Sequence, residues 1–190
     1  MKTSDFDYDL PEELIAQTPV EPRDHSRLLV YHRDSGQTEH RHFYDIIDYL
    51  NPGDALVINE TKVIPARLLG VKEDTGVPVE VLLLRRRNAT DWEALVRPGR
   101  RLRPGTFCSF GDGLLRCEVL DNVEEIGGRI VRFHCDGVFE EILDRLGEMP
   151  LPPYIHEKLQ DPQRYQTVYA KIDGSAAAPF PLLCYSTVRL

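Results

Sequence analysis

Short runs of apolar residues dominate the middle of the chain. Six runs with the alternation or branched side chains typical of β-strands follow one another, at residues 66–71, 78–84, 91–96, 106–110, 114–120 and 129–135. Glycine and proline lie between them, as at Pro98-Gly99 and Gly127-Gly128. Many short strands at near-regular spacing predict a small antiparallel β-barrel.

The segments on either side of this region have a different pattern. Apolar residues recur at helical spacing in 43–50 and 138–146, and Pro11 opens a third short helix at 12–17. The Ser35-Gly36 turn joins residues 27–32 to 37–43 as a hairpin, and 55–59 is a continuous apolar run. Such a run indicates a strand that is buried on both faces. We therefore predict an α+β fold, in which an incomplete α/β core domain is interrupted by the inserted barrel. The expected segments are 1–65 (core), 66–147 (barrel) and 148–190 (core, truncated).

Composition and charge place this fold among ordinary globular proteins. The chain has 190 residues, of which 42% are hydrophobic and 28% charged. It begins without a basic, apolar export signal and has no apolar stretch of about 20 residues. The cysteines stand far apart, which favours free thiols in the cytosol and no metal site. We expect a cytoplasmic monomer.

The net charge of −8 argues against a nucleic-acid partner, but the charge is unevenly distributed. Residues 85–103 hold seven arginines against Asp91 and Glu93, a local charge of +5. Phosphate binding depends on such a local field more than on the net charge. A solvated loop is the alternative interpretation, although arginine forks suit phosphates and bases. The predicted tRNA-binding residues are Arg85, Arg86, Arg87, Arg97, Arg100, Arg101 and Arg103.

General catalytic motifs are absent, and polar clusters near strand ends remain as candidate sites. No glycine-rich dinucleotide fingerprint, P-loop or nucleophile elbow is present. The clusters are RDHSRLL, NETKVIPARL, LPPYIHEKLQDPQRYQTVYA and GSAAAP. Each of them taken alone also fits a local role in turns or strands.

Together these clusters resemble one family. FDYDLPEELIAQTPVEPRDHSRLL, LVINETKVIPARL, WEALVRPG, LPPYI and DPQRYQTVYA occur in this order. The chain is similar in these motifs to the S-adenosylmethionine:tRNA ribosyltransferase-isomerases of queuosine biosynthesis, from residue 5 to about 179. The family commonly has Asp at the position of Glu60, which keeps the carboxylate. After Pro179 the sequence FPLLCYSTVRL departs from the family, so we expect a truncated or frameshifted C-terminus.

The resemblance implies a definite reaction without a metal. Such enzymes transfer and isomerise the ribosyl group of S-adenosyl-L-methionine onto 7-aminomethyl-7-deazaguanine in the tRNA anticodon. The products are epoxyqueuosine in tRNA, adenine and methionine. The reaction needs a base for a proton next to the sulfonium and an acid for the departing adenine.

Residue type and motif position suggest which side chains meet these needs. The candidate proton-transfer residues are Glu60, Asp24 and Glu80. The candidate substrate-binding residues are Arg23, Ser26, Arg27, Asn59, Thr61, Lys62, Arg67, Tyr154, Tyr165, Gln166 and Thr167. Among these, the lysine and the arginines can bind the methionine carboxylate or tRNA phosphates, and the tyrosines can stack on a base.

Two other interpretations stay open at this stage. In the first, the chain is a non-catalytic RNA-binding β-barrel module that uses Arg85 to Arg103. In the second, it is an inert remnant that binds nothing. The module predicts tRNA binding with a steep salt dependence and no consumption of S-adenosylmethionine.

Overall fold

The computed structural model of the chain describes residues 1–175 and 183–185. These residues fall into two compact units. The N-terminal unit contains 1–58, 152–160 and 183–185, and the barrel unit contains 59–151 and 161–175. Each unit is described by itself.

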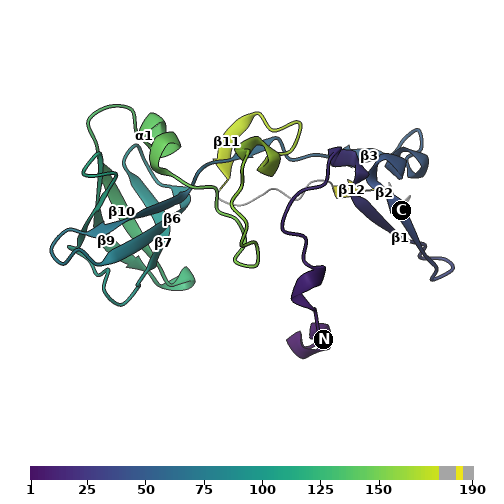
Figure 1. Cartoon of the computed structure of the whole chain (residues 1–190), viewed down its shortest axis with the longest axis horizontal. Coiled ribbons are helices and arrows are strands. Elements are labelled where there is room, and N and C mark those ends of the chain that lie inside the picture. The colour runs from purple at the N-terminus through teal and green to yellow at the C-terminus, as the bar shows by residue number, and fades with distance from the viewer. Residues whose placement is uncertain (176–182, 186–190) are drawn as a thin grey trace. The chain divides into compact units, whose positions relative to one another are not determined.

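The barrel unit is built around a closed six-stranded antiparallel barrel, which confirms the predicted barrel (Figure 1). The strands close in the order β10-β7-β6-β5-β8-β9. They are β5 (Arg67–Lys72), β6 (Pro78–Arg86), β7 (Asp91–Arg97), β8 (Phe107–Phe110), β9 (Leu115–Val123) and β10 (Gly128–His134).

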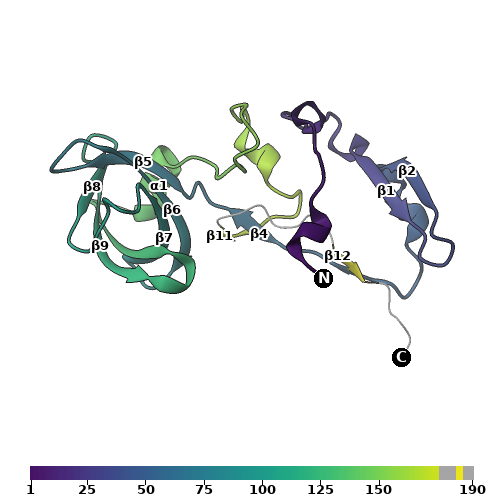
Figure 2. The same cartoon turned by 90° about the horizontal axis from the view of Figure 1, so that it is seen from below.

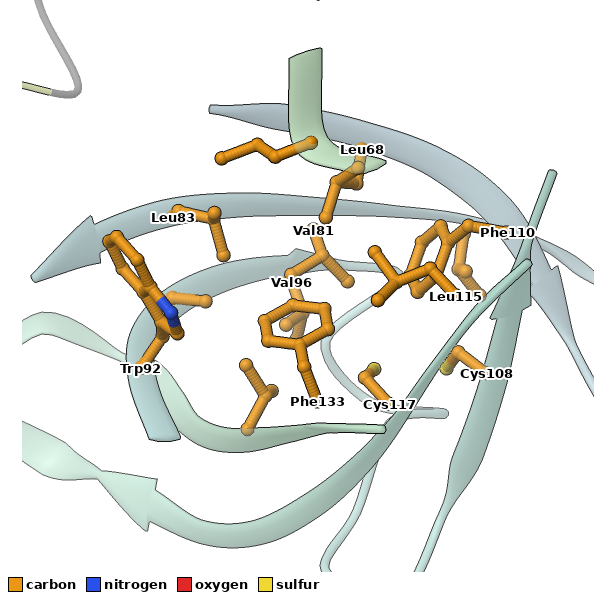
Figure 3. Packing of buried hydrophobic residues seen from close by; sticks show 14 of the residues in the cluster. Leu68, Val81, Leu83, Trp92, Val96, Cys108, Phe110, Leu115, Cys117 and Phe133 are labelled. Carbon is orange, nitrogen blue, oxygen red and sulfur yellow. The ribbon is translucent and has the colours of Figure 1, made fainter. Parts of the chain in front are cut away.

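Inward-facing apolar side chains from all six strands fill the barrel. Leu68, Val81 and Leu83 converge with Phe110 and Leu115 in its interior, and all are almost fully buried (Figure 3). The only α-helix among the described residues, α1 (Phe139–Leu146), adds three more buried side chains, Phe139, Ile142 and Leu143. These three side chains belong to the same buried cluster as the barrel residues, so the barrel and α1 form one core. Each such side chain contributes about 1.5–3 kcal/mol when buried.

Segments before and after the barrel pair with each other. In the barrel unit, β4 (Thr61–Val63) runs parallel to β11 (Ile172–Ser175), and the two lie side by side in Figure 2. In the N-terminal unit, β3 (Ala55–Val57) is antiparallel to β12 (Leu183–Tyr185). The strands β1 (Arg27–Tyr31) and β2 (Thr38–His42) form the expected hairpin.

The remaining helical segments are 3₁₀ helices, which corrects two predictions. The helix expected at 12–17 is a single 3₁₀ turn, Glu12–Leu14, and the backbone is already extended at Ile15. The helix expected at 43–50 is a 3₁₀ helix of seven residues. The 3₁₀ segments are Thr3–Phe6, Glu12–Leu14, Arg23–His25, Phe43–Tyr49, Glu124–Ile126 and Pro162–Tyr165.

The prediction that residues 55–59 are buried on both faces is wrong for the described structure. Leu56, Val57 and Ile58 are 47%, 48% and 41% exposed. An apolar run shows a preference for burial, but burial also needs covering layers, and within the described residues β3 gains only the short β12 as a strand partner.

The regular secondary structure of the described residues is mostly β. Its helices are all too short or too polar to cross a membrane, as far as residues 1–175 and 183–185 show.

Candidate functional site

The NETKV motif meets a segment more than a hundred residues later in the chain. The backbone oxygen of Glu60 accepts hydrogen bonds from the amides of Lys171 (2.7 Å) and Ile172 (3.1 Å). The Lys171 ammonium lies 2.9 Å from the Glu60 carboxylate, and Lys62 stands opposite Asp173 in the strand register. We call Glu60, Lys62, Lys171 and Asp173 the β4–β11 cluster.

Sequence reasoning missed Lys171 and Asp173. They precede the GSAAAP motif, but no spacing rule reveals that they pair with residues 60–62. Asn59 has a local role beside them, because its side-chain oxygen accepts a hydrogen bond from the Thr61 amide at 2.9 Å. The cluster thus brings together a half-exposed carboxylate, two lysines and a second acid, while Asn59 fixes the turn before them.

Gln166 clamps the backbone of β4. Its side-chain oxygen accepts from the Val63 amide at 2.8 Å, and its side-chain nitrogen donates to the Val63 oxygen at 2.7 Å. The side chain is buried. It supplies the two backbone hydrogen bonds that a neighbouring strand would otherwise make with Val63. This structural role accounts for both polar atoms of Gln166, and its predicted contact with a substrate stays untested.

Other residues of the third motif lie in different surroundings. The Tyr165 hydroxyl donates to the Pro150 oxygen at 3.4 Å. The Thr167 hydroxyl is buried and has no hydrogen-bond partner within the described residues. Tyr154 belongs to the N-terminal unit, where its ring is exposed. The motif is therefore shared between the two units.

Glu80, a candidate base on β6, faces an arginine. The Arg67 Nε atom lies 3.3 Å from its carboxylate, and both side chains are about two-thirds buried. Arg67 is itself held by a backbone bridge to Glu148 and donates to the Leu151 oxygen at 3.4 Å. The pair anchors the start of β5.

The RDHSRLL motif forms a turn in the N-terminal unit. The Ser26 hydroxyl donates to the Arg23 oxygen at 2.7 Å, and the Phe43 amide donates to the Ser26 oxygen at 2.7 Å. Asp24 lies in this turn, and Arg27 begins β1. The predicted catalytic carboxylates are thus divided, with Asp24 in one unit and Glu60 and Glu80 in the other.

Three rings of the N-terminal unit come together beside this turn. His42 and Tyr44 stack with centroids 5.2 Å apart, and His25 meets the edge of Tyr44 at the same distance. The Tyr44 hydroxyl lies 3.2 Å from the His42 Nδ1 atom. Their spacing in the sequence gives no signal, because the hairpin and the following 3₁₀ helix bring them together.

The predicted tRNA-binding arginines differ in their environments. Arg85 and Arg87 both bind the buried Glu93 carboxylate, at 2.5 and 2.7 Å, and the Arg85 hydrogen bond lowers the Glu93 pKa. Arg86 donates to Glu140 at 2.6 Å and lies over the ring of Trp92. Four further arginines are exposed and make no ion pair within the described residues. They are Arg97, Arg100, Arg101 and Arg103.

The acid next to this patch belongs to the barrel. Asp91 accepts two hydrogen bonds from Arg132, at 2.7 and 2.8 Å, and others from Asn88 and Thr90. The Arg132 bonds, above all, hold the Asp91 pKa well below its usual range. Across the described residues, no group of three or more histidine, cysteine, aspartate or glutamate side chains has the geometry to hold a metal ion.

Comparison with known proteins gives consistent similarities. The sequence profile of a family described as "Queuosine biosynthesis protein" matches residues 3–188. A relative from Symbiobacterium thermophilum, named S-adenosylmethionine:tRNA ribosyltransferase-isomerase, is 63% identical over 179 residues, which are 94% of this chain and 52% of the relative. The protein of the same name from Pelotomaculum thermopropionicum is 61% identical over 186 residues, 98% of this chain and 54% of the relative.

A solved structure is also similar in sequence. The match is to the crystal structure of S-adenosylmethionine tRNA ribosyltransferase from Thermotoga maritima, whose sequence is 43% identical. The aligned region covers 80% of this chain and 52% of the Thermotoga maritima chain, with a TM-score of 0.38. The chain spans about half the length of the curated relatives it matches.

Proposed function

Because the chain belongs to the queuosine biosynthesis protein family, we propose that it takes part in ribosyl transfer from S-adenosylmethionine to tRNA. In this reaction the ribosyl group is transferred and isomerised onto 7-aminomethyl-7-deazaguanine in the anticodon. Epoxyqueuosine in tRNA, adenine and methionine are the products. The family match over residues 3–188 carries the proposal.

The β4–β11 cluster supports a role for Glu60 in proton transfer. Its carboxylate is half-exposed and faces the Lys171 ammonium at 2.9 Å, so a ligand can reach it. An ionised carboxylate can accept a proton or hold the sulfonium cation of the substrate. Lys171 then positions Glu60, a role that the sequence did not suggest.

The other predicted residues have roles that follow from their chemistry. Glu80, which is paired with Arg67, is proposed as a proton-transfer residue. Lys62, Arg23 and Arg27 are proposed to bind the methionine carboxylate or phosphates. The exposed ring of Tyr154 and the half-buried ring of Tyr165 are proposed to stack on a base. Asp24 is proposed as a second proton-transfer residue.

We further propose that residues 1–65 and 148–190 belong to one core domain, interrupted by the barrel at 66–147. Two strand pairings support this division, because β4 and β3 precede the barrel while β11 and β12 follow it. We propose that this domain acts in the cytoplasm, as a monomer and without a metal.

The test is adenine release from S-adenosylmethionine by this chain, with tRNA that carries the deazaguanine precursor. We expect release that depends on the modified tRNA. Glu60→Gln should lower turnover at least a hundredfold and leave tRNA binding within about twofold. Glu141→Gln, which alters an exposed glutamate on α1, is the matched control and should keep full turnover.

Two results would overturn the proposal. Equal turnover of Glu60→Gln and Glu141→Gln would remove Glu60 from the mechanism. No release by this chain, with a full-length relative active under the same conditions, would show that these residues are insufficient for the reaction. The four exposed arginines favour one alternative, a non-catalytic RNA-binding barrel. That alternative predicts salt-sensitive tRNA binding without adenine release.

A further inference from the structure

The arginine-rich segment forms two separate surfaces in the structure. Arg85–Arg87 lie by the turn that joins β6 and β7, whereas Arg97 ends β7. The seven residues of β7 separate the two by about 20 Å, at ~3.3 Å for each residue step. A patch that is continuous in the sequence is therefore divided in space.

The first surface is largely neutralised. Glu93 binds both Arg85 and Arg87, and Glu140 binds Arg86. The Glu93 carboxylate is only 9% exposed, so its two arginines are needed to satisfy it. These three arginines have a structural task in the barrel.

The second surface is a loop that the barrel holds in place. From β10, the Arg129 guanidinium donates to the oxygens of Gly99 and Leu102, both at 2.8 Å. The Leu102 side chain is fully buried in the barrel core. The Arg101 amide donates to the Pro98 oxygen at 3.1 Å and closes a turn. We call residues 97–103 the arginine loop.

The arginine loop presents positive charge from a fixed backbone. Its four arginines are exposed and unpaired within the described part of the chain. Glu80 stands opposite Arg97 in the strand register, but its carboxylate pairs with Arg67 at 3.3 Å. A fourfold positive charge on an ordered loop attracts a polyanion and loses little entropy when it binds one.

We infer that the arginine loop binds the phosphate backbone of tRNA and that Arg129 is its positioning residue. This inference rests on the proposed function, because it assigns the surface that receives the proposed tRNA substrate. Arginine forks bind phosphates in a bidentate manner, whichever base they carry, so the contact is independent of sequence. The inference does not include Arg85, Arg86 and Arg87, because their charges are paired with Glu93 and Glu140.

Equilibrium binding of the tRNA to this chain between 50 and 200 mM salt tests the inference. The loop variant combines Arg100→Gln, Arg101→Gln and Arg103→Gln. Its matched control removes the same charge through Arg33→Gln, Arg145→Gln and Lys158→Gln, which are exposed and distant in sequence. Each lost phosphate contact lowers the steepness of log K against log salt by about 0.7–0.9, so the loop variant, which lacks three arginines, should lose about 2–3. At 100 mM salt its affinity should fall roughly tenfold to a hundredfold, and that of the control less than threefold.

Arg129→Lys tests the positioning role separately. It keeps the charge but loses the fork that spans Gly99 and Leu102. We expect affinity to fall at least fivefold with the salt slope and the melting temperature nearly unchanged. Unchanged affinity would refute the positioning role.

The outcomes also separate this inference from the proposed function. Equal binding by the loop variant and its control would overturn the inference and leave the proposed function standing. Failure of the unaltered chain to bind tRNA at 50 mM salt would overturn both. Adenine release would decide the proposed function independently.

Discussion

Replacing Gln166 by leucine removes the clamp on β4 while keeping a side chain of similar size. The Val63 amide and oxygen both lose a buried hydrogen-bond partner, formerly at 2.8 and 2.7 Å. Leucine can fill the space but offers no polar atom. The change therefore tests whether this one side chain holds the strand that follows Glu60.

The expected cost follows from the two bonds. Each hydrogen bond contributes about 1 kcal/mol net, and each buried polar group left unpaired costs about 1–3 kcal/mol. The additional apolar burial of leucine offsets part of this, so we expect a loss of about 2–4 kcal/mol in local stability. Such a loss corresponds to a thirtyfold to thousandfold increase in opening of the strand.

Native-state hydrogen exchange of the peptide around Val63 measures this opening. Gln163→Leu is the control, because Gln163 lies in the 3₁₀ helix that ends just before Gln166 and has an exposed side chain. We expect faster exchange around Val63 in Gln166→Leu alone, with exchange in β6 and β7 unchanged. Equal protection of the Val63 amide in both variants would refute the clamp. Faster exchange across the whole barrel would show that the effect of the substitution is global.

Two further predictions concern the stability of the barrel. Asp91→Asn should cost about 2–3 kcal/mol at pH 7, because Arg132 loses its charged partner. The Asp91 pKa is lowered in the folded state, so its stabilisation is present above the unfolded value of about 4 and disappears as the pH falls further. Urea unfolding should therefore show a smaller difference between parent and variant at pH 2.5 than at pH 7, and a constant difference would contradict the assignment. Gly70→Ala should lower the melting temperature, at a cost of about 1–3 kcal/mol, because a new Cβ would lie 2.3 Å from the Ser109 oxygen and 2.4 Å from the Phe110 ring. Gly99→Ala, where the nearest atom is 3.6 Å away, is its control and should melt like the parent.

The barrel could be predicted from the sequence because its signals are local. Alternation of apolar residues, interrupted by glycine and proline, marks each strand without reference to the rest of the chain. The run at 78–84 became β6 and the run at 129–135 became β10, with ends shifted by one or two residues. Helix α1 was equally predictable, since Ile142 and Leu143 form part of a clear apolar stripe.

The candidate site was less predictable because its contacts are long-range. Gln166 and Val63 are 103 residues apart, and the polar type of Gln166 fits a ligand contact as well as a backbone clamp. The arginine patch shows the converse difficulty. Closeness in sequence suggested one surface, but an intervening strand carries Arg97 away from Arg87 and two acids neutralise only one end.

The distribution of buried side chains separates the two proposed activities. Every buried apolar residue of the described structure lies between Val63 and Leu143, and none lies in residues 1–58. Hydrophobic stabilisation is proportional to the apolar area buried, so it is concentrated in the barrel and α1. The arginine loop takes its order from this core through Leu102 and Arg129, whereas the β4–β11 cluster depends on the Gln166 clamp outside it. Loss of the clamp should therefore abolish adenine release while tRNA affinity is retained, a separation that a single continuous site would not allow.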